Sequence, residues 1–141
     1  NFIQRNTITA NPVGISSIEG SRNRIRRNAI FGNTNAGLRD DGTAQAPAAP
    51  LIADVGVDFV KGSACSGCRV EVFSDQDDEG RWFEGETVAA SDGQFMMRKS
   101  GTLLRGPRVS ATATDLSGAT SVFSATARTP PPPPRRRAVG R

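Results

Sequence analysis

Short apolar positions separated by asparagines recur along residues 1–42. An Asn-x-Ile pattern returns at a constant offset of 22 positions, and a Gly-Ile pair returns as Gly-Leu after 23. The matched positions are Asn1 and Asn23, Ile3 and Ile25, Asn6 and Asn28, Ile8 and Ile30, Asn11 and Asn33, Gly14 and Gly37, and Ile15 and Leu38. A repeat of this length, with three short strands and three bends in each copy, predicts a coil of stacked parallel strands whose isoleucine and leucine side chains point inward.

The asparagines have a physical role in such a coil. Asparagine tolerates the left-handed backbone conformation at bends, and stacked asparagine side chains can form hydrogen-bonded ladders. All seven asparagines of the chain fall within residues 1–35. Because two turns of a stacked repeat cannot bury a stable core alone, we expect further turns upstream of Asn1.

Residues 51–127 show a different pattern, in which short runs of apolar and β-branched residues are separated by turn signals. The predicted strands are residues 55–59, 70–73, 87–90, 94–97, 109–114 and 121–126, and the turns are at residues 61–62, 66–67, 91–93 and 116–118. This spacing predicts an antiparallel β-sandwich of immunoglobulin-like type. Residues 43–50 are rich in Ala and Pro and are interpreted as a linker. Residues 128–141, with five prolines followed by three arginines, predict a disordered tail.

Two resemblances follow from these residues. The repeated Asn, Ile and Gly positions of residues 1–42 resemble the last rungs of a right-handed parallel β-helix, as in the pectate-lyase-like and nitrous-oxide-reductase-maturation-like repeat families of secreted bacterial proteins. Spaced motifs within residues 51–126, which run from Val60-Lys-Gly-Ser-Ala-Cys to Thr120-Ser-Val-Phe-Ser, look like the bacterial Ig-like domain that often follows a β-helix. The resemblance implies a secreted or cell-surface location and a spacer or binding role.

Charge and composition exclude several classes of function. The net charge of +4 comes from the two ends, because residues 43–127 hold seven basic and eleven acidic side chains while residues 128–141 hold five arginines and no acid. This distribution argues against a nucleic-acid-binding domain. The chain has no His, which excludes Ser–His–Asp and Cys–His catalysis and zinc sites with His ligands. No apolar run is long enough to span a membrane, so we expect no membrane insertion.

Cys65 and Cys68 form a C-x-x-C motif that admits three interpretations. A thioredoxin-type redox motif would need a helix beginning at the first cysteine, but strands are predicted on both sides. A zinc site would need further ligands from a partner chain. We favour a small disulfide across the turn, which predicts an oxidising compartment.

The acidic stretch after residue 74 has the ligand spacing of a calcium loop. Counting Asp75 as position 1 places Asp77 at position 3, Glu79 at 5 and Glu86 at 12, with Gly80 at 6. Because strands are predicted on both sides, this would be a calcium loop between strands and not an EF-hand. The alternative is a solvated acidic hairpin tip.

Four side chains are candidate glycan contacts. Trp82 either covers the sandwich core or forms an exposed platform for sugar rings. Alternation places Arg22, Arg24 and Arg26 on the outer face of one turn, where they could meet an acidic polysaccharide. The alternative is a solvated strand face that discourages edge pairing.

No convincing catalytic constellation emerges from these residues. The sequence therefore predicts a non-enzymatic, extracellular or cell-surface structural or adhesive module that caps and displays a β-helix and binds surface polysaccharide. The alternative function is the C-terminal part of a β-helix polysaccharide lyase or glycoside hydrolase whose active site lies upstream, which rests on analogy between folds.

Overall fold

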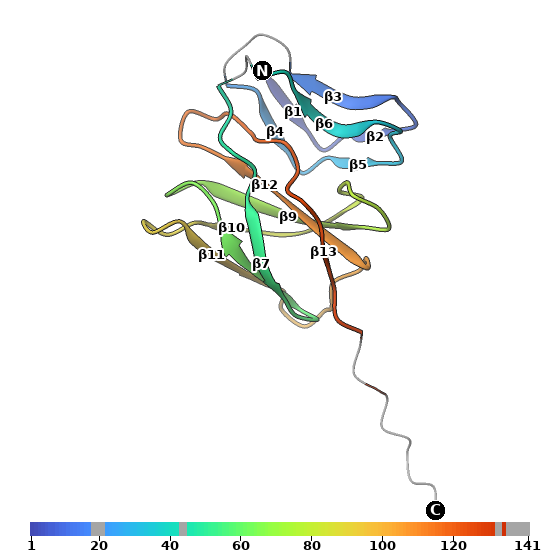
Figure 1. Ribbon diagram of the computed structural model, residues 1–141, viewed down its shortest axis with the longest axis vertical. Coiled ribbons are helices and arrows are strands. Elements are labelled where there is room, and N and C mark those ends of the chain that lie inside the picture. Colours follow the sequence, from blue (N-terminus) through green and yellow to red (C-terminus); the bar gives the residue numbers. More distant parts are fainter. Residues whose placement is uncertain (18–21, 43–44, 132–133, 135–141) are drawn as a thin grey trace, which may run out of the picture.

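The computed structural model describes residues 1–17, 22–42, 45–131 and 134. These residues form thirteen strands and no helix. The first six strands form a compact repeat at one end of the molecule, and the other seven form a β-sandwich beneath it (Figure 1). The all-β class predicted from the sequence is thus confirmed. In the described part of the chain, no helix is long and apolar enough to cross a membrane.

The repeat consists of two turns that stack strand on strand. Each turn contributes three short strands, and each strand of the first turn pairs in parallel with its counterpart in the second. The pairs are β1 (Phe2–Gln4) with β4 (Arg24–Arg26), β2 (Thr7–Thr9) with β5 (Ala29–Phe31), and β3 (Val13–Ser17) with β6 (Ala36–Asp40). The register aligns Ile3 with Ile25, Ile8 with Ile30 and Ile15 with Leu38, which are the offsets of the sequence repeat.

Asparagine side chains connect the two turns at their bends. The Nδ2 atoms of Asn1, Asn6 and Asn11 donate to the Oδ1 atoms of Asn23, Asn28 and Asn33 at 2.7, 3.2 and 3.4 Å, respectively. The left-handed conformation, however, falls one residue before the asparagine and not on it. Positive φ angles occur at Arg5, Ala10, Arg22, Arg27 and Gly32. The asparagines thus serve as hydrogen-bonding groups that brace the bend, and the preceding residue turns the chain.

The sandwich is built from two antiparallel sheets. One sheet has the order β10-β9-β12-β13 and the other β11-β8-β7, an arrangement of immunoglobulin-like type. The strands are β7 (Leu51–Val55), β8 (Phe59–Ser63), β9 (Arg69–Asp75), β10 (Trp82–Val88), β11 (Gln94–Arg98), β12 (Arg108–Thr114) and β13 (Ala127–Arg128). Side chains from both sheets fill the core between them, among them Val60, Val70, Val72, Phe95, Met97 and Val109.

Some sequence predictions differ from this architecture. The apolar run at residues 55–59 is not one strand, because the chain turns between β7 and β8, where the Gly56 amide donates to the Phe59 carbonyl at 2.9 Å. Residues 121–126 run beside β12 without forming a regular strand. The right-handed parallel β-helix is not confirmed, since the described residues contain only two stacked turns of parallel strands and the larger sheets are antiparallel. Of the predicted tail, residues 132–133 and 135–141 lie outside the described residues.

Cys65 and Cys68 form the predicted disulfide in the turn between β8 and β9. The same turn is braced by the Cys68 amide, which donates to the Cys65 carbonyl at 3.1 Å. Cys68 is buried at 2% exposure and Cys65 is half-buried. The bond closes a turn that is already hydrogen-bonded, so it reinforces local structure instead of joining the two sheets.

Replacing both cysteines, Cys65→Ser with Cys68→Ser, should lower the free energy of unfolding by about 2 kcal/mol or less, because a disulfide across so short a loop removes little entropy from the unfolded chain. Urea unfolding would measure this loss. The intact mass without reductant should be lower than the reduced mass by two hydrogen atoms. Two free thiols under oxidising conditions would contradict the assignment.

Candidate functional site

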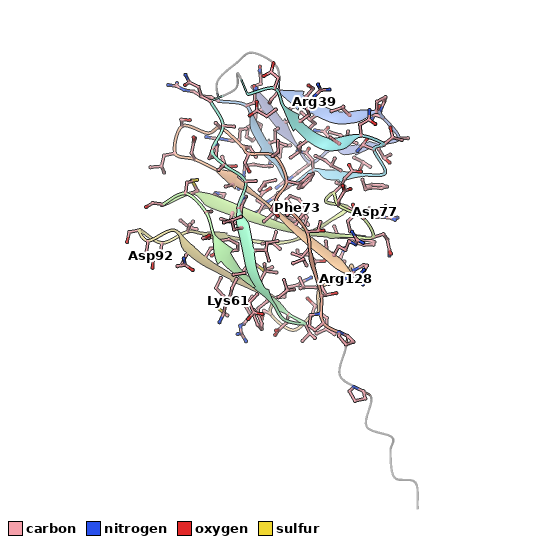
Figure 2. All side chains as sticks on the ribbon, viewed as in Figure 1. Arg39, Lys61, Phe73, Asp77, Asp92 and Arg128 are labelled. Atoms are coloured by element: carbon pink, nitrogen blue, oxygen red, sulfur yellow. A yellow bond between two sulfur atoms is a disulfide. The ribbon has the colours of Figure 1, made fainter. Side chains whose placement is uncertain are left out.

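The candidate functional site is the junction where the second turn of the repeat meets the outer face of the sheet that contains β9 and β12. Phe73 of β9 lies in the middle of this junction (Figure 2). Its ring makes edge-to-face contacts with Phe83 and Phe123, with ring centroids 5.8 and 5.7 Å apart. Phe123 in turn packs against the apolar interior of the repeat, whose buried members are Ile25, Ile30 and Leu38. The repeat and the sandwich therefore share a continuous apolar contact.

The backbone of the second turn is hydrogen-bonded to the sandwich at two of its three sides. Ile30 and Gly80 exchange a pair of backbone hydrogen bonds of 3.0 and 2.8 Å. At β4, the Thr120 amide donates to the Asn23 carbonyl at 3.0 Å, and the Ile25 amide donates to Thr120 Oγ1 at 2.9 Å. Gly80 is needed for the close approach, since a Cβ there would lie 2.8 Å from the Phe123 ring and 2.9 Å from Phe73.

Glu79 occupies a position equivalent to the asparagine of a further turn. Its carboxylate accepts from the Asn33 amide at 2.7 Å and from Asn33 Nδ2 at 2.7 Å. One turn higher, Asn33 Oδ1 accepts in the same way from the amide and the Nδ2 of Asn11, at 3.1 and 3.4 Å. Glu79 is 3% exposed, and it lies so close to Gly37 that a Cβ there would be 2.7 Å from its Oε2 atom.

Two further carboxylates, those of Glu71 and Glu86, hold the bend before β5. Glu71 of β9 accepts from the amide of Arg27, a residue with φ of 51°, at 3.0 Å, and from Arg26 Nε at 3.4 Å. Glu86 of β10 lies beside it and binds Arg26 Nη2, Arg27 Nη2 and Arg69 Nη1 at 3.0, 3.0 and 3.2 Å. The Arg27 guanidinium also lies 5.2 Å from the centroid of the Phe83 ring. These contacts fix a strained bend to the sheet below it.

The two carboxylates have opposite pKa shifts. Burial raises the pKa of Glu71, although hydrogen bonds from the Arg27 amide and Arg26 oppose the shift. Burial also acts to raise the pKa of Glu86, but the hydrogen bonds from Arg26 and Arg27 outweigh it and lower the pKa below its ordinary value of 4.5. Glu86 therefore stabilises the junction as an anion, whereas the charge of Glu71 is costly to bury.

The four predicted calcium ligands do not come together. Glu79 binds Asn33, and Glu86 binds arginines on a different part of the junction. Asp77 is exposed at the edge of the sandwich (Figure 2). Asp75 is buried, its Oδ1 accepts from the Gln76 amide, and its Oδ2 has no partner, so that burial raises its pKa. Among the described residues, no group of three or more His, Cys, Asp or Glu side chains could hold a metal ion, and calcium stays a prediction without geometric support.

The predicted glycan contacts are likewise dispersed. Trp82 is half-buried. The Arg81 guanidinium lies 4.9 Å from the centroid of the Trp82 ring and 4.8 Å from that of the Phe31 ring of the repeat. Arg22 and Arg24 are exposed, but Arg26 turns toward Glu71 and Glu86. The three arginines therefore do not form one outward-facing row, and glycan binding stays a prediction.

Several junction residues escaped the sequence analysis, above all Glu71, Phe73 and Thr120. The available signal was in the strand Val70–Phe73. A strand with solvent on one face would carry polar residues opposite Val70 and Val72, but this strand places a Phe next to its Glu on that second face. A large aromatic side chain there indicates that both faces of the strand are covered.

Comparisons with known proteins do not reveal a family. No family model matches the chain, and no curated protein matches it. Among solved structures, the fibronectin type-III domain of human fibronectin type III domain containing protein 3 is similar at a TM-score of 0.41 and 14% sequence identity, over 67% of this chain and 93% of that one. A likeness this weak carries no argument about family or function. The identification with a pectate-lyase-like β-helix followed by a bacterial Ig-like domain is wrong by these comparisons, since no family model and no curated protein of either kind matches the chain.

Glu79→Ala should lower the free energy of unfolding by about 2 kcal/mol, because two N–H groups of Asn33 lose a charged acceptor in a partly buried place. Asp78→Ala, which removes the exposed acid next to it, should change stability by less than about 0.5 kcal/mol. Urea unfolding of both variants measures the difference. Equal effects would show that Glu79 contributes only as a surface charge.

Glu86→Gln should destabilise the protein by about 1 kcal/mol at neutral pH, since the paired arginines lose their anion. The folded-state pKa of Glu86 is lowered, so its contribution is present above the ordinary value of 4.5 and is lost as the pH falls through the folded value. The stability difference between wild type and variant should therefore shrink in acid. A difference that is constant across this range would contradict the role of the charge.

Proposed function

We propose that the sandwich acts as the end cap of the parallel repeat, so that this chain is a structural module and not an enzyme. The observation that carries the proposal is the position of Glu79, which accepts from Asn33 as Asn33 accepts from Asn11. Thr120 supports it in the same way. The Arg24, Ala29 and Thr34 amides of the second turn donate to the carbonyls of Asn1, Asn6 and Asn11, and the Thr120 amide donates likewise to the Asn23 carbonyl. The sandwich thus takes the place of a third turn.

Such a cap answers a general problem of stacked strands. The last turn of a stack leaves a row of unpaired N–H and C=O groups, and an open strand edge invites pairing with another chain. Terminal units of repeat proteins therefore need a cover that differs from the repeat itself. In this chain the cover is a folded domain, the sandwich. It contacts the last turn through Gly80, Thr120 and the carboxylates of Glu71, Glu79 and Glu86.

We also propose an extracellular or cell-surface setting for this module. The Cys65–Cys68 disulfide supports it, because disulfides persist in oxidising compartments and are rare in reducing ones.

Amide hydrogen exchange on the full chain tests the cap. In a Glu79→Ala/Thr120→Val double variant, the amides of β4, β5 and β6 should exchange faster while those of β9 and β12 keep their protection, because the repeat loses its lower acceptors and the sandwich core does not change. Thr120→Val preserves the shape of the side chain and removes its Oγ1, which accepts from the Ile25 amide and also hydrogen-bonds Thr114 Oγ1 of β12 at 2.8 Å. A Thr120→Val single variant therefore measures separately what the sandwich loses.

The matched control is Ser74→Ala in the same sheet. Ser74 Oγ donates to Glu84 at 2.6 Å and accepts from the Gly106 amide at 2.9 Å, and neither partner belongs to the repeat. This variant should destabilise the sandwich without selectively exposing β4, β5 and β6. If the double variant and the control lose protection in the same regions, the sandwich is not a specific cap.

A further inference from the structure

The end of the repeat opposite the sandwich is formed by β1, β2 and β3, and none of the described strands covers it. We name it the open end. Each of these strands pairs with the second turn along one edge and has no strand on its other edge within the described residues. In Figure 1 this end lies at the far side of the molecule from the sandwich, next to the N-terminus.

The polar groups of the open end repeat an arrangement that is already occupied one turn lower. In the second turn, Asn28 Oδ1 accepts from the amide and the Nδ2 of Asn6, and Asn33 Oδ1 accepts from those of Asn11. Within the described part of the chain, no group donates to the Oδ1 atoms of Asn6 and Asn11 themselves. The first turn thus presents the same pair of acceptors, in the same places, without donors above them.

The apolar interior shows the same asymmetry. Ile25, Ile30 and Leu38 of the second turn are buried at 7, 2 and 8% exposure. Their partners in the first turn, Ile3, Ile8 and Ile15, are only half-buried, since they are covered from one side alone. Placing a second layer of isoleucines above them would bury the same kind of surface that the second turn already buries, which is favourable for apolar side chains.

We infer that the open end binds a further turn of parallel strands with the same 22-residue pattern. This inference rests on the proposed end-cap function and names the partner that the capped repeat receives at its other end. The occupant must present N–H donors downward at its bends, as Asn6 and Asn11 do toward Asn28 and Asn33. A second copy placed head to head would instead set its own asparagine Oδ1 acceptors against those of Asn6 and Asn11.

The experiment is to extend the full chain by a copy of its own residues 1–22, placed directly before Asn1. The copied asparagines then fall in register above Asn1, Asn6 and Asn11. Hydrogen exchange in β1, β2 and β3 should slow by roughly tenfold, because these strands gain partners on their open edge. The concentration of urea at the unfolding midpoint should rise as well.

The matched control carries the same extension with its copies of Asn6 and Asn11 changed to Asp. Aspartate has nearly the same shape but no Nδ2 donor, and its charge faces an acceptor, so this extension should protect β1, β2 and β3 far less. Equal protection by both extensions, or by neither, would overturn the inference. So would dimerisation of the unextended chain with protection of the same strands, detected by sedimentation, because a second copy would then be the occupant.

The same exchange data separate this inference from the proposed function. Protection of β4, β5 and β6 reports on the cap, and protection of β1, β2 and β3 reports on the open end. If the second turn stays protected while the first gains nothing from the extension, only the open-end inference fails. If the second turn is unprotected even without the extension, the end-cap function fails.

Discussion

The structure depends on one constraint, which is that the N–H groups at the bends of the last turn must find acceptors. Between the two turns, the asparagine carboxamides of the lower turn supply them. Below the second turn there is no asparagine, and Glu79 and Glu71 of the sandwich take over at the bends, while Thr120 accepts from the Ile25 amide within β4. A buried amide without an acceptor costs about as much as a good hydrogen bond contributes, so the position of the repeat on the sandwich is fixed by where these acceptors lie.

This requirement explains why β9 is covered on both faces. Val70 and Val72 point into the core between the sheets, while on the other face Glu71 binds the repeat directly and Phe73 packs against Phe123, which contacts the repeat. The molecule therefore has three layers, with the four-stranded sheet in the middle (Figure 1). Phe73 contributes apolar contact and Glu71 contributes the acceptor, but the burial of Glu71 carries an electrostatic cost that the adjacent Arg26 and Arg27 offset only in part. The charged groups of the junction therefore work as one network, and Glu86 keeps the arginines in place.

The sequence analysis correctly predicted the parts of this structure that depend on local sequence pattern. The 22-residue offset predicted the correct register of β1 with β4 and of β2 with β5, the 23-residue offset predicted that of β3 with β6, and the C-x-x-C spacing predicted the disulfide. It failed at Val55–Phe59, where apolar alternation continues across a tight turn, because alternation alone does not show where a chain reverses. It also placed the left-handed residues one position too late, since an asparagine that braces a bend and one that forms it look alike in sequence.

The acidic spacing from Asp75 to Glu86 illustrates a deeper limit. Alternating carboxylates beside a strand can converge on a cation or can accept hydrogen bonds from another part of the chain, and the spacing is the same in both cases. Here the donor to Glu79 is Asn33, 46 residues earlier, and the donors to Glu86 are Arg26 and Arg27. Only the tertiary contact distinguishes the two outcomes.

The choice of carboxylates also gives the repeat a direction. An ionised carboxylate accepts hydrogen bonds and donates none, so it can close only the side of a turn whose bends present N–H groups. The lower side of the second turn is such a side, because the amides of Arg27 and Asn33 point toward Glu71 and Glu79. The upper side of the first turn presents carboxamide oxygens instead, which a carboxylate would repel. The same sandwich could not cap the opposite end, and the polarity of the asparagine contacts therefore determines which end of the repeat the sandwich closes.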